Sequence, residues 1–385
     1  MEAHSLPEAL NLIMEQRGCS QSQLGRDLGK GHTWVSETIS GKRGLDFAKV
    51  INALARVGWE VVIRPEREKS DPVKRREFMA ATASATFIPS PKAGPYEDPA
   101  NVLDLARRVA RARYEHGGGA TAATAMRHIR RIHQVVTGRD RHLQEAASQL
   151  AVQTVWTLND ARRFDAGENV GRLALELARL SQSPYAQSRA YSALTALNVE
   201  RGSLDRALMY ARDGVRLCEV PEAQHAWMRL RKAQTLALVR GQQHASRDEL
   251  ESVQAPLGDR GFADQSSFDV ADMMGNIGRA LNNVGAPAEA HGTLDAAVAL
   301  LDGTRPNLQS EFLAQQVIAA LRMSQPSLAA DRMLALAHVA PLVDSGRLDD
   351  YLRDVLAESA RWTTVPEIRA AREQLKALVP DGAPR

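Results

Sequence analysis

Cysteine is almost absent from this sequence, which holds only Cys19 and Cys218 in 385 residues. The two lie far apart and form no CxxC pair, so neither a disulfide framework nor a zinc site is predicted. No apolar run approaches the roughly 18 residues of a membrane-spanning helix, and residues 1–10 do not resemble a signal peptide. We therefore expect a protein of the reducing cytoplasm that has no membrane partner.

Aromatic residues are also scarce, at 5% of the chain, although hydrophobic residues reach 44%. The core must therefore be built from Ala, Leu and Val, a composition that favours helices. The formal net charge is only +3, so an affinity for nucleic acid has to come from a local patch. The length predicts two or three domains.

Motifs for catalysis are missing as well. The chain has no P-loop, no dinucleotide fingerprint and no assembly of nucleophile and base. The HGGG segment that starts at His116 mimics an oxyanion-hole motif, but no GxSxG accompanies it, and we interpret it as a loop. The histidines near it lack the helical i, i+4 spacing of a zinc site. We expect no enzymatic activity, no cofactor and no bound metal.

Composition divides the chain into three parts. Residues 1–69 are predicted to form a small helical domain that ends in one short strand, WEVVIR, from Trp59 to Arg64. Residues 70–99 are rich in Pro and Ser and read as a linker around a short helix from Arg75 to Ala85. Residues 100–385 are a succession of helices. The predicted fold is all-α except for the single strand.

The most informative segment is CSQSQLGRDLGKGHTWVSETISGKR, over residues 19–43. Ser20 is a candidate N-cap for a first helix, and Gly29 supplies a turn. Val35 and Ile39 give a second helix, from about His32 to Ser40, an apolar inner face. This spacing predicts a helix-turn-helix, in which the second helix enters the major groove of DNA.

The candidate DNA contacts lie on this second helix and on the residues that flank it: Gln21, Lys30, His32, Thr33, Trp34, Ser36, Glu37, Lys42 and Arg43. Glu37 can accept a hydrogen bond from a cytosine amino group, and Thr33 can touch a thymine methyl or an adenine. Lys42 and Arg43 suit phosphates. Trp34 has two interpretations, a core residue or a stacking contact with DNA.

These residues resemble the xenobiotic-response-element, or phage-repressor-like, family of helix-turn-helix domains. The resemblance covers about residues 6–58 and implies that Gln21 binds phosphate and that His32, Thr33 and Glu37 read bases. It also implies that Gly41, Lys42 and Arg43 form the turn after the recognition helix. The sequence departs from the family at Thr38, where an apolar residue is usual, at Ile39, where a Glu is usual, and at Trp34, which is bulky for its position. The alternative is a small helical bundle without DNA contact.

The predicted strand needs a partner, because an isolated strand cannot satisfy its backbone. No second strand is evident nearby in the sequence, so we expect the same strand of a second copy to pair with it. The residues of this dimer strand are Trp59, Val61, Val62 and Ile63. A homodimer would supply the two-fold symmetry that a palindromic site requires. The alternatives are a strand that docks on its own linker, or an extension of the preceding helix.

The C-terminal part contains internal repeats. Leu-Asn pairs recur at Asn159, Asn198 and Asn282, at offsets that correspond to a period near 40 residues. This period predicts six or seven pairs of antiparallel helices, stacked as a superhelical solenoid with a concave inner wall. The repeats are similar to tetratricopeptide-like pairs. The order of the three parts resembles that of actinobacterial regulators with a helix-turn-helix, a linker helix with an RREF sequence, and a repeat domain.

Related peptide receptors use Asn side chains on inner helices to bind the ligand backbone, because an amide both donates and accepts hydrogen bonds. This resemblance implies a ligand site made of Trp156, Asn159, Asn198, Arg201 and Asn282. The alternative is that each Asn is a left-handed cap at a helix end.

A segment rich in arginine opens the repeats; its arginines are Arg107, Arg108, Arg111, Arg113, Arg127, Arg130 and Arg131. It is interpreted either as a second phosphate-binding surface or as a solvated face.

These observations predict a sequence-specific regulator of transcription that binds double-stranded DNA. Its repeat domain would sense a peptide or small molecule, mediate dimerisation, or do both. The alternative is a protein-interaction module or antitoxin-like adaptor, in which the solenoid binds a protein partner.

Overall fold

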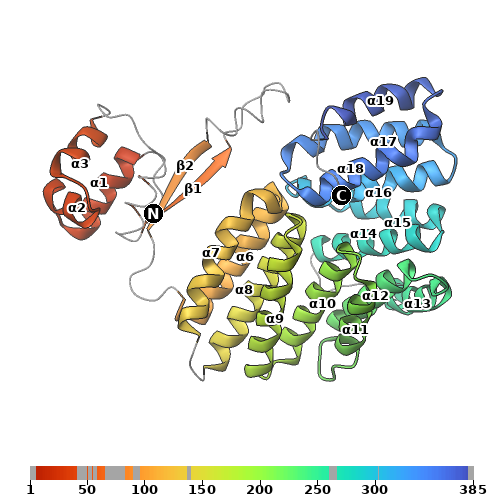
Figure 1. Cartoon of the computed structure of the whole chain (residues 1–385), viewed down its shortest axis with the longest axis horizontal. Helices are drawn as coiled ribbons and strands as arrows, with labels where there is room; N and C mark the ends of the chain where they lie inside the picture. The colour runs from red at the N-terminus through yellow and green to blue at the C-terminus, as the bar shows by residue number, and fades with distance from the viewer. Residues whose placement is uncertain are drawn as a thin grey trace. The chain divides into compact units, whose positions relative to one another are not determined.

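The computed structural model describes residues 6–40, 50, 54, 59–65, 83–89, 96–136, 140–259, 267–301 and 303–379. The chain forms two compact units, Met1–Pro95 and Tyr96–Arg385 (Figure 1). Within the described ranges the chain is helical apart from one two-stranded sheet, which confirms the predicted fold class. None of the described helices is both long and apolar enough to cross a lipid bilayer.

The N-terminal unit contains helices α1 (Leu6–Arg17), α2 (Gln21–Asp27) and α3 (His32–Ile39). Their apolar sides share one small core around Leu10, Leu24 and Val35, all fully buried. The predicted helix signals are confirmed. The Ser20 hydroxyl accepts a hydrogen bond from the Gln23 amide at the start of α2, and Gly29 takes the left-handed conformation with φ 66°.

The strand predicted from Trp59 to Arg64 is present as β1 (Trp59–Pro65), and it pairs antiparallel with β2 (Ala83–Pro89). The register runs from Trp59 opposite Pro89 to Pro65 opposite Ala83. This pairing corrects the expectation that no second strand lies nearby: the Pro-rich linker supplies one. The linker helix predicted over Arg75–Ala85 is wrong at residues 83–85, and residues 75–82 lie outside the described part. Thr86, Phe87 and Ile88 favour extended backbone, and pairing satisfies the polar groups along the edge of β1.

The second unit consists of helix pairs. The first, or inner, helices are α6 (Pro99–His116), α8 (Arg141–Asp160), α10 (Pro184–Glu200), α12 (Glu222–Leu238), α14 (Ser267–Val284), α16 (Pro306–Arg322) and α18 (Gly346–Glu358). The second, or outer, helices are α7 (Gly118–Val135), α9 (Phe164–Leu180), α11 (Leu204–Val215), α13 (Gln243–Asp259), α15 (Pro287–Ala299), α17 (Pro326–Val339) and α19 (Pro366–Lys376). Two short 3-10 helices, Ala340–Leu342 and Ser359–Trp362, lie between the last helices.

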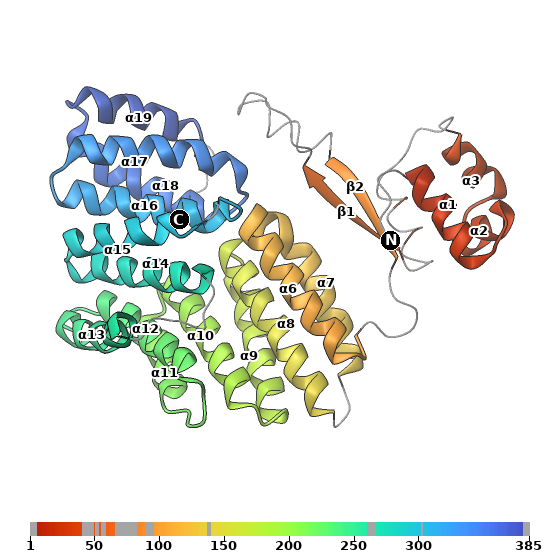
Figure 2. The ribbon, with the colours of Figure 1, turned by 180° about the vertical axis from the view of Figure 1, so that it is seen from behind.

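The inner helices begin at residues 99, 141, 184, 222, 267, 306 and 346, which is 38 to 45 residues apart. The predicted period near 40 residues is therefore confirmed. Each inner helix contacts the next one along the chain, so the inner helices form a continuous layer, and Figure 2 shows their succession from α6 to α16.

The turns between inner and outer helices repeat one feature of the backbone. A residue with positive φ follows six of the inner helices, at Gly117, Arg162, Gly202, Gly241, Gly285 and Ser324. This residue stands three or four positions after the Asn of each Leu-Asn pair. None of the three asparagines has a positive φ, so the interpretation of the Asn residues as left-handed caps is wrong.

The first and last repeats are in contact, because α6 touches α16 and α8 touches α18. The amide of Asp344 donates to the His116 carbonyl at 2.9 Å, and the amide of Gly119 donates to the Asp344 carbonyl at 2.9 Å. Gly117 has φ 87°, and a Cβ there would lie 2.2 Å from the Asp344 carbonyl oxygen. The HGGG segment that was interpreted as a loop is thus the point where the solenoid closes on itself.

Candidate functional site

Helix α3 presents one polar stripe to solvent. Thr33, Ser36 and Ser40 are exposed and Glu37 is half-buried, whereas Val35 and Thr38 on the opposite side are buried. The exposed positions follow the i, i+3, i+4, i+7 spacing of one helix face. The structure therefore brings the predicted residues Thr33, Ser36 and Glu37 together. Ser40 belongs to the same stripe, and its i+7 spacing from Thr33 was the signal that could have added it.

Trp34 lies on the buried side of α3 rather than on this stripe. Its side chain is only 9% exposed and packs in the core of the N-terminal unit. This corrects its place among the candidate DNA contacts and supports the alternative, a core residue. The unusual Thr38 is explained by the same packing: its hydroxyl donates to the Trp34 carbonyl at 2.6 Å, so this polar group is satisfied inside the helix.

The flanking candidates are placed as follows. Gln21 is the first residue of α2 and is exposed, and Lys30 is half-buried in the turn after Gly29. His32 begins α3, but its side chain is outside the described part of the structure, as are Lys42 and Arg43. The turn between α2 and α3 packs closely against Gly25 of α2. A Cβ at position 25 would lie 3.2 Å from the Gly31 carbonyl oxygen, so the absence of a side chain there allows the tight turn.

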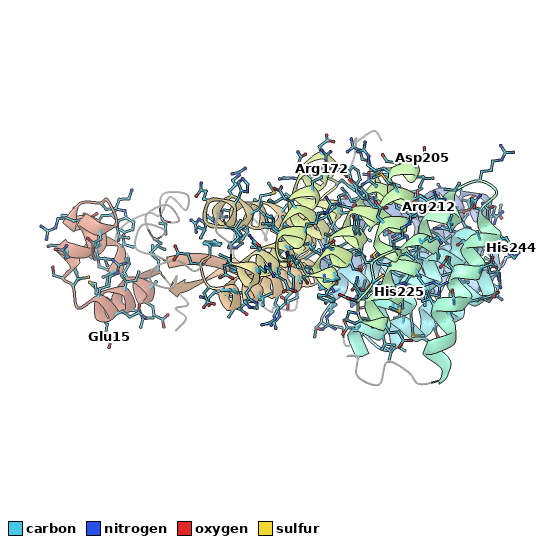
Figure 3. All side chains as sticks on the ribbon, turned by 90° about the horizontal axis from the view of Figure 1, so that it is seen from below. Glu15, Arg172, Asp205, Arg212, His225 and His244 are labelled. Atoms are coloured by element: carbon cyan, nitrogen blue, oxygen red, sulfur yellow. The ribbon has the colours of Figure 1, made fainter. Side chains whose placement is uncertain are left out.

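The repeat unit contains a cavity of about 230 Å³ that is open to solvent on one side. All of its lining residues come from inner helices, and they are mostly polar. Five arginines line it, Arg113, Arg189, Arg231, Arg279 and Arg347, with four acids, Glu200, Asp269, Asp272 and Glu311. Three aromatic rings also contribute, those of Tyr114, Trp156 and Trp227. The outer surface carries charges that extend into solvent instead, such as Arg172, Asp205 and His244 in Figure 3.

Two of the five predicted ligand residues, Trp156 and Asn159, line the cavity. Asn159 is 2% exposed, and its Oδ1 has no hydrogen-bond partner among the described residues. The structure thus brings these two residues together on the inner face of α8.

The other three predicted ligand residues lie elsewhere. The side-chain amide of Asn198 donates to Glu168 Oε2 at 2.8 Å and to the Leu194 carbonyl at 2.9 Å. The amide of Asn282 donates to the Gln315 carbonyl at 2.9 Å. Arg201 pairs with Asp165 on the surface at 2.9 Å. Asn198 and Asn282 therefore each join two neighbouring helices.

Sequence reasoning missed a chain of ion pairs that crosses the interior, which we call the ionic chain. It runs through Arg162, Glu200, Arg279, Glu311, Arg347 and Asp160. Arg162 Nη1 lies 2.8 Å from Glu200 Oε2, and Arg347 Nη2 lies 2.9 Å from Glu311 Oε2. Burial opposes the ionisation of Glu200, but the guanidiniums of Arg279, Arg162 and Arg347 more than offset it and hold its pKa well below the usual range. No local pattern marked these residues, because their partners lie far along the chain, as Arg279 lies from Glu200.

A second missed feature is Arg231, which is held between two tryptophans. Its guanidinium carbon lies 5.0 Å from the centroid of the Trp156 ring and 5.4 Å from that of Trp227. Its Nη1 donates to Gln234 Oε1 at 2.6 Å and to Asn276 Oδ1 at 3.0 Å. Burial lowers the pKa of Arg231 to about 10, so the group stays charged at neutral pH.

The arginine-rich segment at the start of the repeats separates into two kinds of position. Arg113 is buried and lines the cavity. The other six are exposed: Arg107, Arg108, Arg111, Arg127, Arg130 and Arg131.

No family model and no curated protein sequence matches the chain. Among solved structures, the crystal structure of Bacillus thuringiensis PlcR in complex with the peptide PapR7 and DNA aligns with it. The alignment covers 97% of this chain and 99% of that chain, at 14% sequence identity and a TM-score of 0.38. A TM-score of this size does not establish a common fold.

Proposed function

We propose that the protein is a sequence-specific DNA-binding transcriptional regulator whose repeat unit holds an effector. The observation that carries this proposal is the polar stripe of α3, in which Thr33 and Ser36 are exposed and Glu37 is half-buried, while Val35 and Trp34 anchor the helix in its core. A helix anchored in this way presents hydroxyl and carboxylate groups to base edges in a major groove. The polar stripe begins at Thr33, near the N-terminus of α3. In helix-turn-helix domains that read DNA, the N-terminal residues of the second helix contact the base edges.

The cavity supports the sensing part of the proposal. It is polar, and it is lined by seven inner helices that belong to different repeats. A ligand that binds one conformation of the solenoid more tightly than another would shift the equilibrium toward that conformation. A polar cavity of this kind favours a small effector over the alternative, a protein partner bound by the repeats. We also propose that the protein works in the cytoplasm and catalyses no reaction.

Dimerisation is a further part of the proposal. Within the described residues β1 pairs with β2 along one edge, and a two-stranded sheet offers a second edge on each strand to another copy. A pair of copies would place two recognition helices on two half-sites. Sedimentation equilibrium of the full chain at micromolar concentration tests this: a dimer is expected, and a monomer would contradict it.

The experiment that tests DNA reading is a salt-titrated binding assay of the full chain. It compares DNA from the protein's own upstream region with scrambled DNA of the same length, for wild type and for the double variant Thr33→Ala/Glu37→Ala. Each lost base contact is expected to reduce discrimination by roughly 1–3 kcal/mol, while the salt dependence, which reports phosphate contacts, stays nearly unchanged.

Glu15→Ala is the matched control, because it also removes a carboxylate from the same unit but from an exposed position on α1 (Figure 3). It is expected to keep the preference for the specific DNA. If wild type binds both DNAs equally and with steep salt dependence, the contacts are to phosphates alone, and the proposal of a sequence-specific regulator fails.

A further inference from the structure

The charged residues that line the cavity fall into two groups by their ion pairing. In the first group, Glu200 and Glu311 are already engaged by the arginines of the ionic chain. In the second group, Arg113, Arg189 and Arg231 have no carboxylate oxygen within 4 Å among the described residues. The other acids that line the cavity are Asp269 and Asp272. Three guanidiniums against two carboxylates leave one positive charge to be balanced.

One buried hydrogen-bond donor of this group, Nε of Arg113, has no acceptor among the described residues. The Nη1 and Nε atoms of Arg231 donate to Gln234, Asn276 and Ser192. Buried polar groups in native proteins are nearly always hydrogen-bonded, so the Arg113 donor favours an occupant that brings an acceptor.

The two arginines act on the same part of the cavity. Burial raises the pKa of Asp272 to about 6, and the guanidiniums of Arg231 and Arg113 oppose that rise. Both groups therefore lie within electrostatic reach of one carboxylate. Trp156 and Trp227 hold the guanidinium of Arg231 between their rings, so the donor is fixed in place before any ligand arrives.

The size of the cavity limits the occupant. Its volume of about 230 Å³ exceeds the roughly 150 Å³ of a protein cavity that binds benzene. The occupant that fits has the size of one amino acid or one small aromatic acid.

We propose that this cavity binds a small organic monoanion through its carboxylate, with Arg113 and Arg231 as the groups that hold the two oxygens. The aromatic rings of Tyr114, Trp156 and Trp227 supply flat surfaces for the organic part. A carboxylate suits this place because its two oxygens accept from two separate guanidinium donors. The inference rests on the proposed function in one respect, namely that the occupant acts as the effector.

The test is calorimetric titration of the full chain with acetate and benzoate, each beside its neutral amide, and with inorganic phosphate and an unstructured heptapeptide. Benzoate is expected to bind saturably at one site per chain, and benzamide at least about tenfold more weakly, because hydrogen bonds to charged groups account for most of the difference. Phosphate is expected to bind more weakly than benzoate.

Arg113→Gln is the variant that removes one anchor, and it is expected to weaken benzoate on the order of ten- to a hundredfold. Arg107→Gln lies on the same helix but is exposed, and it is expected to bind benzoate as wild type does. If Arg113→Gln does not fold, Arg189→Gln replaces it, because Arg189 is half-buried and lines the same cavity. It is expected to weaken benzoate severalfold.

Four results would overturn the inference: no saturation by either carboxylate, equal binding of benzoate and benzamide, phosphate as tight as benzoate, or the heptapeptide as the tightest ligand. The DNA assay on the same preparations separates the two proposals. If benzoate binds but no DNA preference is found, the regulator proposal fails and the cavity site stands. If the DNA preference is intact and no carboxylate binds, the cavity inference alone fails.

Discussion

The helix-turn-helix and the closed repeats differ in how far apart in the sequence their essential contacts lie. In the N-terminal unit the turn, the cap and the polar stripe all fall between Ser20 and Ser40. In the repeat unit Asp160 accepts a hydrogen bond from Ser345, and the Arg113 carbonyl accepts one from Asn307. The first unit depends on contacts between residues close in the sequence. The second depends on contacts between the two ends of the row of repeats. Substitutions at these two kinds of contact should therefore differ in size and in reach.

The largest effect is expected at Asp160, which ties the ends of the solenoid together. Its side chain is 1% exposed and accepts from Ser345 Oγ at 2.7 Å, from Asn307 Nδ2 at 3.2 Å and from the Gly118 amide, and it pairs with Arg347. Asp160→Ala leaves the buried charge of Arg347 with one partner fewer and should cost roughly 3–5 kcal/mol of unfolding free energy. Guanidinium denaturation measures the loss, and hydrogen exchange should show it in both α6–α8 and α16–α18.

Asp165→Ala is the control for this experiment, because Asp165 is largely exposed and pairs only with Arg201 on the surface. It should cost less than about 1 kcal/mol. Equal losses for the two variants would mean that closure contributes nothing beyond a surface ion pair.

A smaller, pH-dependent effect is expected at Asp272. Its pKa lies at about 6 rather than 3.8, because burial disfavours the charged form. The folded state therefore holds the proton more tightly than the unfolded state. The contribution of Asp272 to the free energy of unfolding is therefore fully present below about pH 4, and it is lost as the pH rises through about 6. At about 1.4 kcal/mol for each tenfold change in proton affinity, the loss reaches at most about 3 kcal/mol.

Asp272→Asn should abolish this loss and make the protein more stable than wild type at pH 7, with no difference near pH 4. The measurement is the unfolding free energy from pH 4 to pH 8. Asp248→Asn, at an exposed position on α13, should run parallel to wild type. A constant difference between wild type and Asp272→Asn across this range would contradict the assignment.

In the N-terminal unit the expected effects are smaller and stay local. Gly29 has φ 66°, a conformation that costs a residue with a Cβ roughly 1–2 kcal/mol. Gly29→Ala should therefore reduce hydrogen-exchange protection in residues 20–40 of the full chain and leave the repeat helices unchanged. Gly29→Asn should lose less, since Asn tolerates this conformation. Equal losses for Ala and Asn would show that the effect is not conformational.

The smallest effect is expected at the cap of α2. Ser20→Ala removes the hydroxyl that accepts from the Gln23 amide and should cost about 1 kcal/mol, while Ser20→Gly should cost only a few tenths. Both are measured by exchange in peptides that cover α2. Ser22→Ala, at an exposed position within the helix, serves as the control. A loss that spreads to the repeat unit would break the distinction between local and long-range contacts.

The predictions that succeeded from sequence depend on residues a few positions apart. Ser20, Gly29 and the alternation of exposed Thr33 with buried Val35 follow from the geometry of one turn of helix. The prediction failed for the partner of β1, which comes from a linker that its proline content made look irregular. For Trp34 the sequence left a core position and a DNA contact both open, since size alone does not tell whether a ring faces a core or a groove.

The helix-turn-helix, the strand from Trp59 and the period of the repeats follow from the sequence alone, because each depends on spacings no longer than one helix pair. The place where the solenoid closes and the side chains that face its cavity follow from tertiary packing instead. Arg113, Arg231 and Arg347 come together because a small rotation accumulates from one helix pair to the next until the last pair meets the first. That sum depends on the packing between every pair of neighbours, and no local pattern of residues records it.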